Sequence, residues 1–210
     1  MTGVVRGTGT RTRTTSFTSE EAAAGEGTTP LAPVVRVGTA DFDVGAEYAA
    51  ARARAGGAGA VVTFSGCVRD LIDGGAPPAD AAVDEPDRVL ALELEHYPGL
   101  TERSVETVAQ EAARRWPLRA LTVVHRIGRL LPGDQIVLVV VASSHRRAAF
   151  EAACFVMDYL KTRAVFWKKE QSRNGARWIE SREDDHRAAR AWSASDSRDA
   201  AADGEDPASR

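Results

Sequence analysis

Lysine is rare in this sequence, and its few occurrences are clustered. Of the 27 basic residues among 210, only three are lysines, and Lys161, Lys168 and Lys169 lie within nine positions. Arginine keeps its proton near neutral pH, whereas a lysine with a lowered pKa can act as an acid, a base or a nucleophile. The cluster therefore indicates a segment that requires an amine, although three rare residues can also fall together by chance.

A second cationic segment, SSHRRAAF at residues 143–150, follows a strongly apolar run and begins a predicted helix. A helix N-terminus presents free N–H groups and the positive end of the helix dipole, so it attracts anions. Arg146 and Arg147 oppose that dipole, and we therefore expect them, with His145, to lie where an anion binds. Solvated arginines at a helix start are the alternative interpretation.

Lys161 lies near the end of the same predicted helix, which spans 146–162. The predicted apolar face of this helix consists of Phe150, Ala153, Cys154, Met157 and Leu160. Because Lys161 comes four residues after Met157, it falls on this face rather than on the wet one. A lysine in that position either extends its amine to solvent or sits in a pocket that lowers its pKa.

The next predicted strand, VFWKKE at residues 165–170, alternates its side chains between two faces. Phe166, Lys168 and Glu170 share one face, whereas Val165, Trp167 and Lys169 share the other. We therefore expect one of these two lysines to face a pocket and the other to face solvent.

The remaining pattern supplies the elements that hold these residues. Helices are predicted over 44–55, 101–115, 146–162 and 184–192, and strands over 59–69, 89–97, 120–131, 135–143, 165–170 and 177–181. Thr101 and Ser144 are the expected N-caps. Residues 73–88 are rich in Pro, Gly and Asp and are expected to form an exposed loop. The mixed order predicts an α+β domain over 34–192 with a largely antiparallel sheet.

Both ends of the chain differ from this middle part. Residues 1–33 are rich in Thr, Gly, Ser and Glu and are expected to be a disordered leader, and 193–210 an acidic disordered tail. The net charge of −3 argues against a nucleic-acid coat. No apolar run is long enough for a membrane helix. Two cysteines cannot build a disulfide framework, so a reducing cytoplasm is expected.

Several common catalytic motifs are absent. The sequence contains no GxxxxGK[ST], CxxC, HExxH or GxSxG pattern, and its four histidines are far apart in sequence. A zinc site is therefore not expected. Cys67 could be a nucleophile, but a lone cysteine within a strand is more often a small core residue.

The segments TFSGCVRD, LELEHYPGLTE, VVHRIGRLLPGD, SSHRRAAFEAACFVMDYLKTRAVFWKKE and GARWIE occur in one order along residues 34–192. Together they resemble the large, catalytic subunit of molybdopterin synthase, the MoaE family. The resemblance implies an α/β-hammerhead fold with an additional antiparallel β subdomain. It also implies a central homodimer within a heterotetramer, in which each large subunit binds a small ubiquitin-like sulfur carrier. No metal or other cofactor is implied.

The same resemblance implies a reaction. The carrier's C-terminal Gly-Gly thiocarboxylate enters the pocket, and two sulfurs pass in succession to cyclic pyranopterin monophosphate (precursor Z), which forms the dithiolene of molybdopterin. Carried over by position, the catalytic residues are Lys161 and Lys168. The substrate-binding residues are Cys67, Val68, Arg69, His145, Arg146, Lys161, Lys168, Lys169 and Glu170. In this family His145 and Arg146 would reach the pocket of the other protomer.

This sequence departs from the family pattern at two places. Val165 replaces a usual proline, which we expect to loosen the approach to the following strand. The loop at 73–88 is also longer than usual. Two other functions stay open from the residues alone: a non-catalytic anion-binding paralogue, and an acyl or amidotransferase that uses lysine as its base. Capture of a Gly-Gly-ended carrier would separate the synthase from both.

Overall fold

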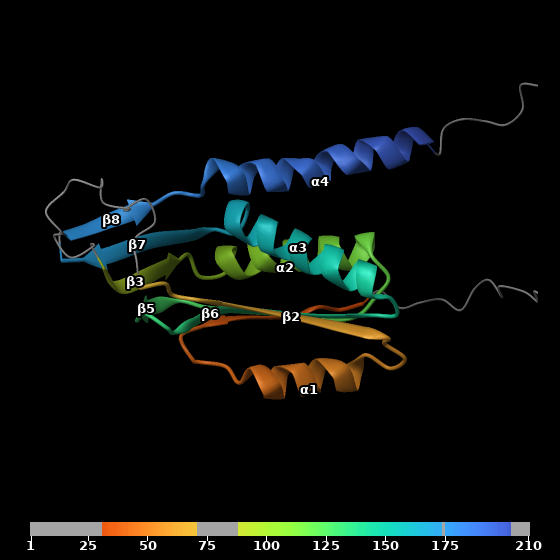
Figure 1. The fold of residues 1–210 in the computed structure, drawn as a ribbon, viewed down its shortest axis with the longest axis horizontal. Helices are drawn as coiled ribbons and strands as arrows, with labels where there is room; N and C mark the ends of the chain where they lie inside the picture. The colour runs from red at the N-terminus through yellow and green to blue at the C-terminus, as the bar shows by residue number, and fades with distance from the viewer. Residues whose placement is uncertain (1–30, 71–87, 174, 203–210) are drawn as a thin grey trace, which may run out of the picture.

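A computed structural model describes residues 31–70, 88–173 and 175–202 of the chain. The predictions for most of the leader, for nearly all of the 73–88 loop and for the end of the tail concern residues outside these ranges. Two four-stranded sheets and four helices make up the described part (Figure 1). The predicted α+β class is confirmed. None of the described helices is long and apolar enough to cross a membrane.

The first sheet has the strand order β1-β4-β6-β2. Its strands are β1 (Val34–Gly38), β4 (Leu118–Arg126), β6 (Gln135–Ser143) and β2 (Ala60–Cys67). β1 runs parallel to β4, whereas the other neighbours are antiparallel. No strand was predicted at β1. This strand is short and lies beside a segment whose composition favours disorder, but its valines gain stability by packing on the core.

The apolar run of β6 is explained by helices on both faces of the first sheet. Helix α1 (Val44–Arg54) covers one face, and α2 (Leu100–Arg115) and α3 (Arg146–Thr162) cover the other (Figure 1). Successive residues of β6 enter the two cores in turn: Val137, Val139 and Val141 on the α2–α3 side, and Leu138, Val140 and Ala142 on the α1 side. A strand buried on both faces has no polar side to expose, so its sequence does not alternate.

The second sheet is antiparallel and has the order β5-β3-β7-β8. Its strands are β5 (Gly128–Leu130), β3 (Val89–His96), β7 (Phe166–Ser172) and β8 (Gly175–Ile179). The single strand predicted over 120–131 is wrong, because the chain leaves the first sheet after Arg126 and joins the second at Gly128. Gly128 has a φ of 82°, which glycine adopts without steric cost and which permits this change of direction.

Helix α3 buries a face that shares only Ala153 and Leu160 with the one predicted. Its buried residues are Ala149, Ala152, Ala153, Phe155, Val156, Tyr159 and Leu160, whereas Phe150 is 59% exposed and Cys154 is exposed. The alanines of this helix fit two helical periodicities almost equally well. The bulk of Phe150 suggested one periodicity, but Phe155 and Tyr159 fill the core in the other.

Two of the predicted helix caps are also wrong. Thr101 lies inside α2, where its Oγ1 accepts a hydrogen bond from the Tyr97 N–H (3.0 Å) and donates one to the Val165 carbonyl (2.8 Å). The N-cap position of α3 is His145 rather than Ser144, whose Oγ accepts a hydrogen bond from Arg119 Nε (2.9 Å). Each hydroxyl joins two elements instead of ending one helix.

Val165, where the resemblance led us to expect proline, is hydrogen-bonded through its backbone just before β7. The Val165 N–H donates a hydrogen bond to Ser104 Oγ (3.2 Å), and the Val165 carbonyl accepts the bond from Thr101. Proline has no N–H and could not make the first bond. Val165 is therefore attached to α2 through both of its backbone groups.

The last helix, α4 (Glu183–Ala202), packs on α3 and is longer than predicted (Figure 1). It continues into the segment that the sequence analysis assigned to a disordered tail. Residues 193–202 contain no Gly or Pro and end in three alanines, the residue with the strongest helix preference. The first glycine beyond them is Gly204, after the helix has ended.

Candidate active site

A cavity of about 540 Å³ lies between the two sheets, the end of α3 and the segment that leads into α4. Its apolar floor includes Val68, Val89, Leu92 and Leu94, which belong to the buried core of the second sheet. Charged side chains stand on several sides of this floor. A site of this kind can hold the flat part of a small molecule on apolar surface and its charged part on polar groups.

Six of the predicted site residues line this cavity. They are Cys67, Val68, Arg69, Lys161, Lys168 and Glu170. They come from the end of β2, the end of α3 and one face of β7, which are far apart in the sequence. The structure therefore brings together the three segments GCVRD, DYLKT and FWKKE.

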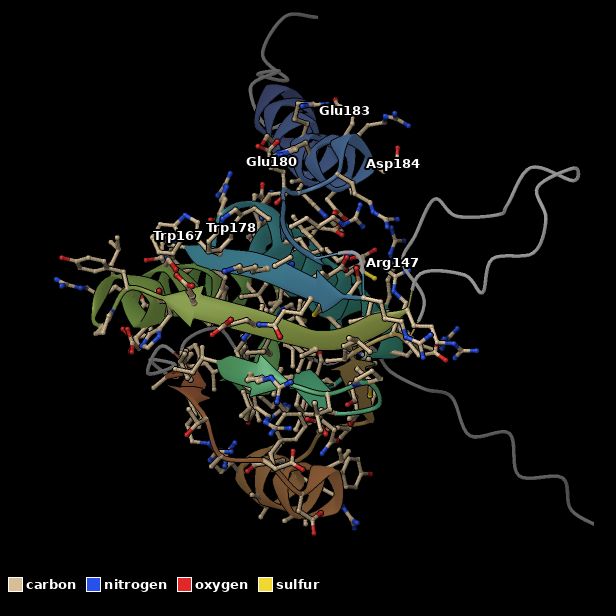
Figure 2. The ribbon with its side chains drawn as sticks, turned by 90° about the vertical axis from the view of Figure 1, so that its left-hand side faces the viewer. Arg147, Trp167, Trp178, Glu180, Glu183 and Asp184 are labelled. Atoms are coloured by element: carbon tan, nitrogen blue, oxygen red, sulfur yellow. The ribbon has the colours of Figure 1, made fainter. Side chains whose placement is uncertain are left out.

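The predicted alternation of β7 is confirmed. Phe166, Lys168 and Glu170 line the cavity, whereas Trp167 and Lys169 do not. The Lys169 Nζ lies 5.4 Å from the centre of the Trp178 ring on the outer face. In Figure 2 Trp167 and Trp178 are labelled toward the left of the view, whereas Asp184, which lines the cavity, is labelled toward the right. The prediction that Lys169 binds substrate is therefore not supported by its position.

Lys161 stands at the cavity wall with half of its side chain exposed, and it is paired with an acid. Its Nζ donates a hydrogen bond to Asp185 Oδ1 at 2.9 Å, and the Lys161 side chain is 48% exposed. Ser181 Oγ donates a second short bond to the Lys161 carbonyl (2.5 Å). The expectation of a lysine on an apolar face is therefore wrong for Lys161, because the face of α3 that carries it is not the buried one.

Lys168 is the desolvated lysine. Burial lowers its pKa, the neighbouring Lys161 ammonium lowers it further, and the Asp185 carboxylate acts in the opposite direction. Burial raises the pKa of Asp185, but the hydrogen bond and charge of Lys161, the Arg182 N–H and the charge of Lys168 together bring that pKa below its ordinary value. The two lysines thus have different environments: Lys161 is half exposed and ion-paired with a carboxylate, whereas Lys168 is buried and its pKa is lowered. Such a pair can divide electrostatic and proton-transfer roles.

His145 and Arg146 lie elsewhere. Both are exposed at the start of α3 and neither lines the cavity. Lys161 is 16 residues after His145, a rise of roughly 24 Å along a helix. Arg147, next to them, forms an ion pair with Glu151 at 2.6 Å. Within one chain, the two predicted cationic groups are therefore at opposite ends of α3 (Figure 1).

In the described part of the chain, sequence reasoning missed seven polar residues of the cavity wall: His125, Arg177, Glu180, Ser181, Arg182, Asp184 and Asp185. His125 and Asp185 matter most here, because they lie nearest in charge and contact to the two lysines. His125 belongs to β4 and is only 6% exposed, in a run whose alternation suggested nothing but core packing. Asp185 is one of three acids in the first turn of α4, where acids are common at any helix start. No local signal distinguishes it. Among the described residues, no three His, Cys, Asp or Glu side chains are grouped so that they could hold a metal ion.

Known proteins resemble this chain over most of its length. A family model described as MoaE protein matches residues 37–163. The molybdopterin synthase catalytic subunit of Mesorhizobium japonicum is 51% identical over 167 residues, which cover 79% of this chain and 96% of that protein. The solved molybdopterin biosynthesis MoaE protein of Burkholderia ambifaria is 48% identical, with a TM-score of 0.62, and the match covers 77% of this chain and 98% of that one.

A more distant solved structure shares the fold. It is a complex of subunits 1 and 2 of the molybdopterin-converting factor from Helicobacter pylori, in which the matched chain is 21% identical with a TM-score of 0.52. The match covers 71% of this chain and 90% of that one. At this identity the likeness establishes the common architecture.

Proposed function

This chain belongs to the MoaE protein family, and from that membership we propose that it is the catalytic subunit of a molybdopterin synthase. The observation that supports this most directly is the cavity that brings Arg69, Lys161 and Lys168 together. The substrate we propose is cyclic pyranopterin monophosphate, and the sulfur donor is the C-terminal thiocarboxylate of a small ubiquitin-like carrier. The product is the dithiolene of molybdopterin.

The cavity contains groups suited to each part of this substrate. The cyclic phosphate is an anion, and Arg69 at the end of β2 offers a guanidinium that hydrogen-bonds phosphate oxygens. The pterin ring is flat and fits an apolar floor such as that formed by Leu92 and Leu94. The carrier's tail is flexible and extended, so it can reach a cavity that its folded part cannot enter.

Sulfur transfer needs both charge stabilisation and proton transfer. The thiocarboxylate sulfur bonds to a substrate carbon while a carbon–oxygen bond at that carbon breaks and its electron pair leaves with the oxygen, and so a thioester forms between carrier and substrate. Water then adds to the acyl carbon, and the tetrahedral oxyanion collapses by breaking the carbon–sulfur bond. The carrier leaves as a carboxylate and the sulfur stays on the substrate as a thiolate. The proton lost by water must pass to a base.

The different environments of the two lysines assign these roles. Lys161, ion-paired with Asp185, stabilises the oxyanion. Lys168, whose pKa is lowered chiefly by burial, is the better placed of the two to accept the proton from water. Cys67 and Glu170 stand at the same wall and contact the substrate.

The assembly we propose is a homodimer of this chain with one carrier bound to each copy. His145 and Arg146 are exposed and lie roughly 24 Å along α3 from Lys161. A two-fold axis would bring the start of one α3 to the cavity of the other copy. The exposed Phe64 and Phe150, on β2 and α3, provide apolar surface for such a contact. We place this assembly in the cytoplasm, where Cys67 and Cys154 stay as thiols.

Reconstitution tests the function. The purified chain is mixed with a thiocarboxylated Gly-Gly-ended carrier and cyclic pyranopterin monophosphate, and the dithiolene is measured. We expect turnover by the wild-type chain and by Lys169→Ala, whose side chain points away from the cavity, and none by Lys168→Ala. A wild-type chain that binds no carrier and forms no dithiolene would overturn the proposal.

A further inference from the structure

The cavity wall contains a histidine that the proposed mechanism does not use, His125. His125 is 6% exposed and lines the cavity near the end of β4. Its Nδ1 lies 2.8 Å from the Arg126 carbonyl oxygen. A carbonyl oxygen only accepts hydrogen bonds, so Nδ1 carries the proton and Nε2 carries the free lone pair.

The ring is held in one orientation. Phe166 stacks on it with a centroid separation of 3.9 Å and an interplanar angle of 17°. The bond from Nδ1 fixes the rotation of the ring in its plane. Burial lowers the pKa of His125 to about 4, and the positive charge of nearby Lys168 acts in the same direction. The imidazole is therefore neutral at physiological pH, and Nε2 is a fixed hydrogen-bond acceptor.

Nε2 is not one of the fully buried polar atoms that lack a partner among the described residues, although the His125 side chain as a whole is buried. No hydrogen bond joins Nε2 to another described residue, so this acceptor is left to the solvent in the cavity. In the free protein a water molecule can donate to it. A ligand that fills the cavity and displaces that water has to supply the donor instead, or the hydrogen bond is lost.

We propose that His125 is a ligand-binding residue, whose Nε2 accepts a hydrogen bond from an N–H group of the bound ligand. This inference rests on the proposed function, which supplies two ligands with such groups. One is the reduced pterin ring, with its ring N–H and amino groups. The other is the carrier's tail, with its glycyl amide N–H groups. The chemistry that His125 recognises is the same in both, and each ligand can be tested alone.

Nitrogen NMR of the histidine ring observes the proposed bond directly. The labelled chain is titrated separately with cyclic pyranopterin monophosphate and with a synthetic peptide ending in Gly-Gly, while calorimetry measures binding. We expect the Nε2 resonance of His125 to move upfield with one ligand, as an unprotonated nitrogen does when it accepts a hydrogen bond. Nδ1 should stay protonated. The ligand that causes the shift identifies the donor.

The outcomes of this titration are distinct. Saturable binding of both ligands with an unchanged Nε2 resonance overturns the role of His125 and leaves the proposed function standing. If neither ligand binds the wild-type chain, the proposed function fails, and the inference about His125 fails with it.

Two matched variants separate ligand binding from a structural role. In His125→Asn the amide nitrogen takes the place of Nδ1 and the acceptor at Nε2 is lost, whereas in His125→Gln the amide oxygen takes the place of Nε2. We expect the Kd of the ligand to rise about tenfold in His125→Asn, the worth of one hydrogen bond, and to stay within about twofold of wild type in His125→Gln. Thermal melting of each variant checks the fold. Equal Kd values in folded His125→Asn and wild-type chains would overturn the inference.

Discussion

Both ends of helix α3 carry basic residues, but one end lines a cavity and the other is exposed. At the C-terminal end of α3, which we call the cavity end, Lys161 is paired with Asp185. It lines a cavity that also contains an apolar floor and the buried amine of Lys168. At the N-terminal end of α3, His145 and Arg146 are exposed and do not line this cavity. Cations at a helix C-terminus are favoured by the dipole, whereas cations at the N-terminus are opposed by it. One end is therefore stabilised within the chain, and the other is arranged to meet something outside it.

The comparison explains why the site is only partly built by one chain. The cavity end supplies the amines and the apolar floor, and both are fixed by contacts among β2, β7, α3 and α4. The open end, which is the N-terminal end of α3 with His145 and Arg146, presents exposed basic side chains that do not line the cavity of their own chain. A second copy of the chain that presents its open end to the cavity would make the anion site complete, which is the arrangement we propose.

Conservative replacement of the two lysines should have the largest effect and should sharpen the comparison within the cavity end. Lys168→Arg keeps the charge but cannot release a proton near neutral pH, so we expect kcat to fall roughly 100-fold or more. Lys161→Arg keeps the charge beside Asp185, and we expect it to retain a substantial part of wild-type activity. Single-turnover kinetics measures both. Equal losses in the two variants would contradict the division of roles.

Acid sensitivity should distinguish the buried histidine of the cavity end from the exposed histidine of the open end. Burial lowers the pKa of His125 from 6.5 to about 4, so its contribution to stability is full above pH 6.5 and is lost as the pH falls toward 4. The loss by pH 4.5 should be roughly 2–3 kcal/mol, from 1.36 kcal/mol per pH unit. Denaturant unfolding at pH 7 and pH 4.5 measures it.

Two glutamine variants complete that experiment. His125→Gln cannot titrate, so its stability should fall less between the two pH values than that of the wild type. His145→Gln changes an exposed side chain and should behave as the wild type does. An acid response of His125→Gln that matches the wild type would show that His125 is not the titrating group.

Removal of the carboxylate at the cavity end should have a smaller effect. Asp185→Asn deprives Lys161 of its partner, and because Lys161 is half exposed we expect only a roughly three- to tenfold loss of kcat. Asp185 also raises the pKa of Lys168, so its loss lowers that pKa further. The rising limb of the pH–rate profile should move to lower pH. Asp184→Asn, whose side chain is not bonded to Lys161, serves as the control.

How far the sequence predicts this molecule also differs between its regions. The strand β6 and the alternation of Lys168 and Lys169 could be predicted, because a long apolar run and a period of two each leave a local signal. The buried face of α3 could not, since its alanines fit two periodicities and only the packing of Phe155 and Tyr159 decides between them. His125 and Asp185 had no local signal, because their position at the cavity depends on contacts between strands and helices far apart in the chain.

The site shared between two copies is tested most directly by complementation. Arg146→Ala lacks a residue of the open end, and Lys161→Ala lacks one of the cavity end. When the two variants exchange subunits, each mixed dimer has one site with both lesions and one site with neither. With random exchange, half of the dimers are mixed, so we expect about a quarter of wild-type activity from two nearly inactive parents. If activity stays at the parental level although exchange is demonstrated, each site is built within one chain and the account is wrong.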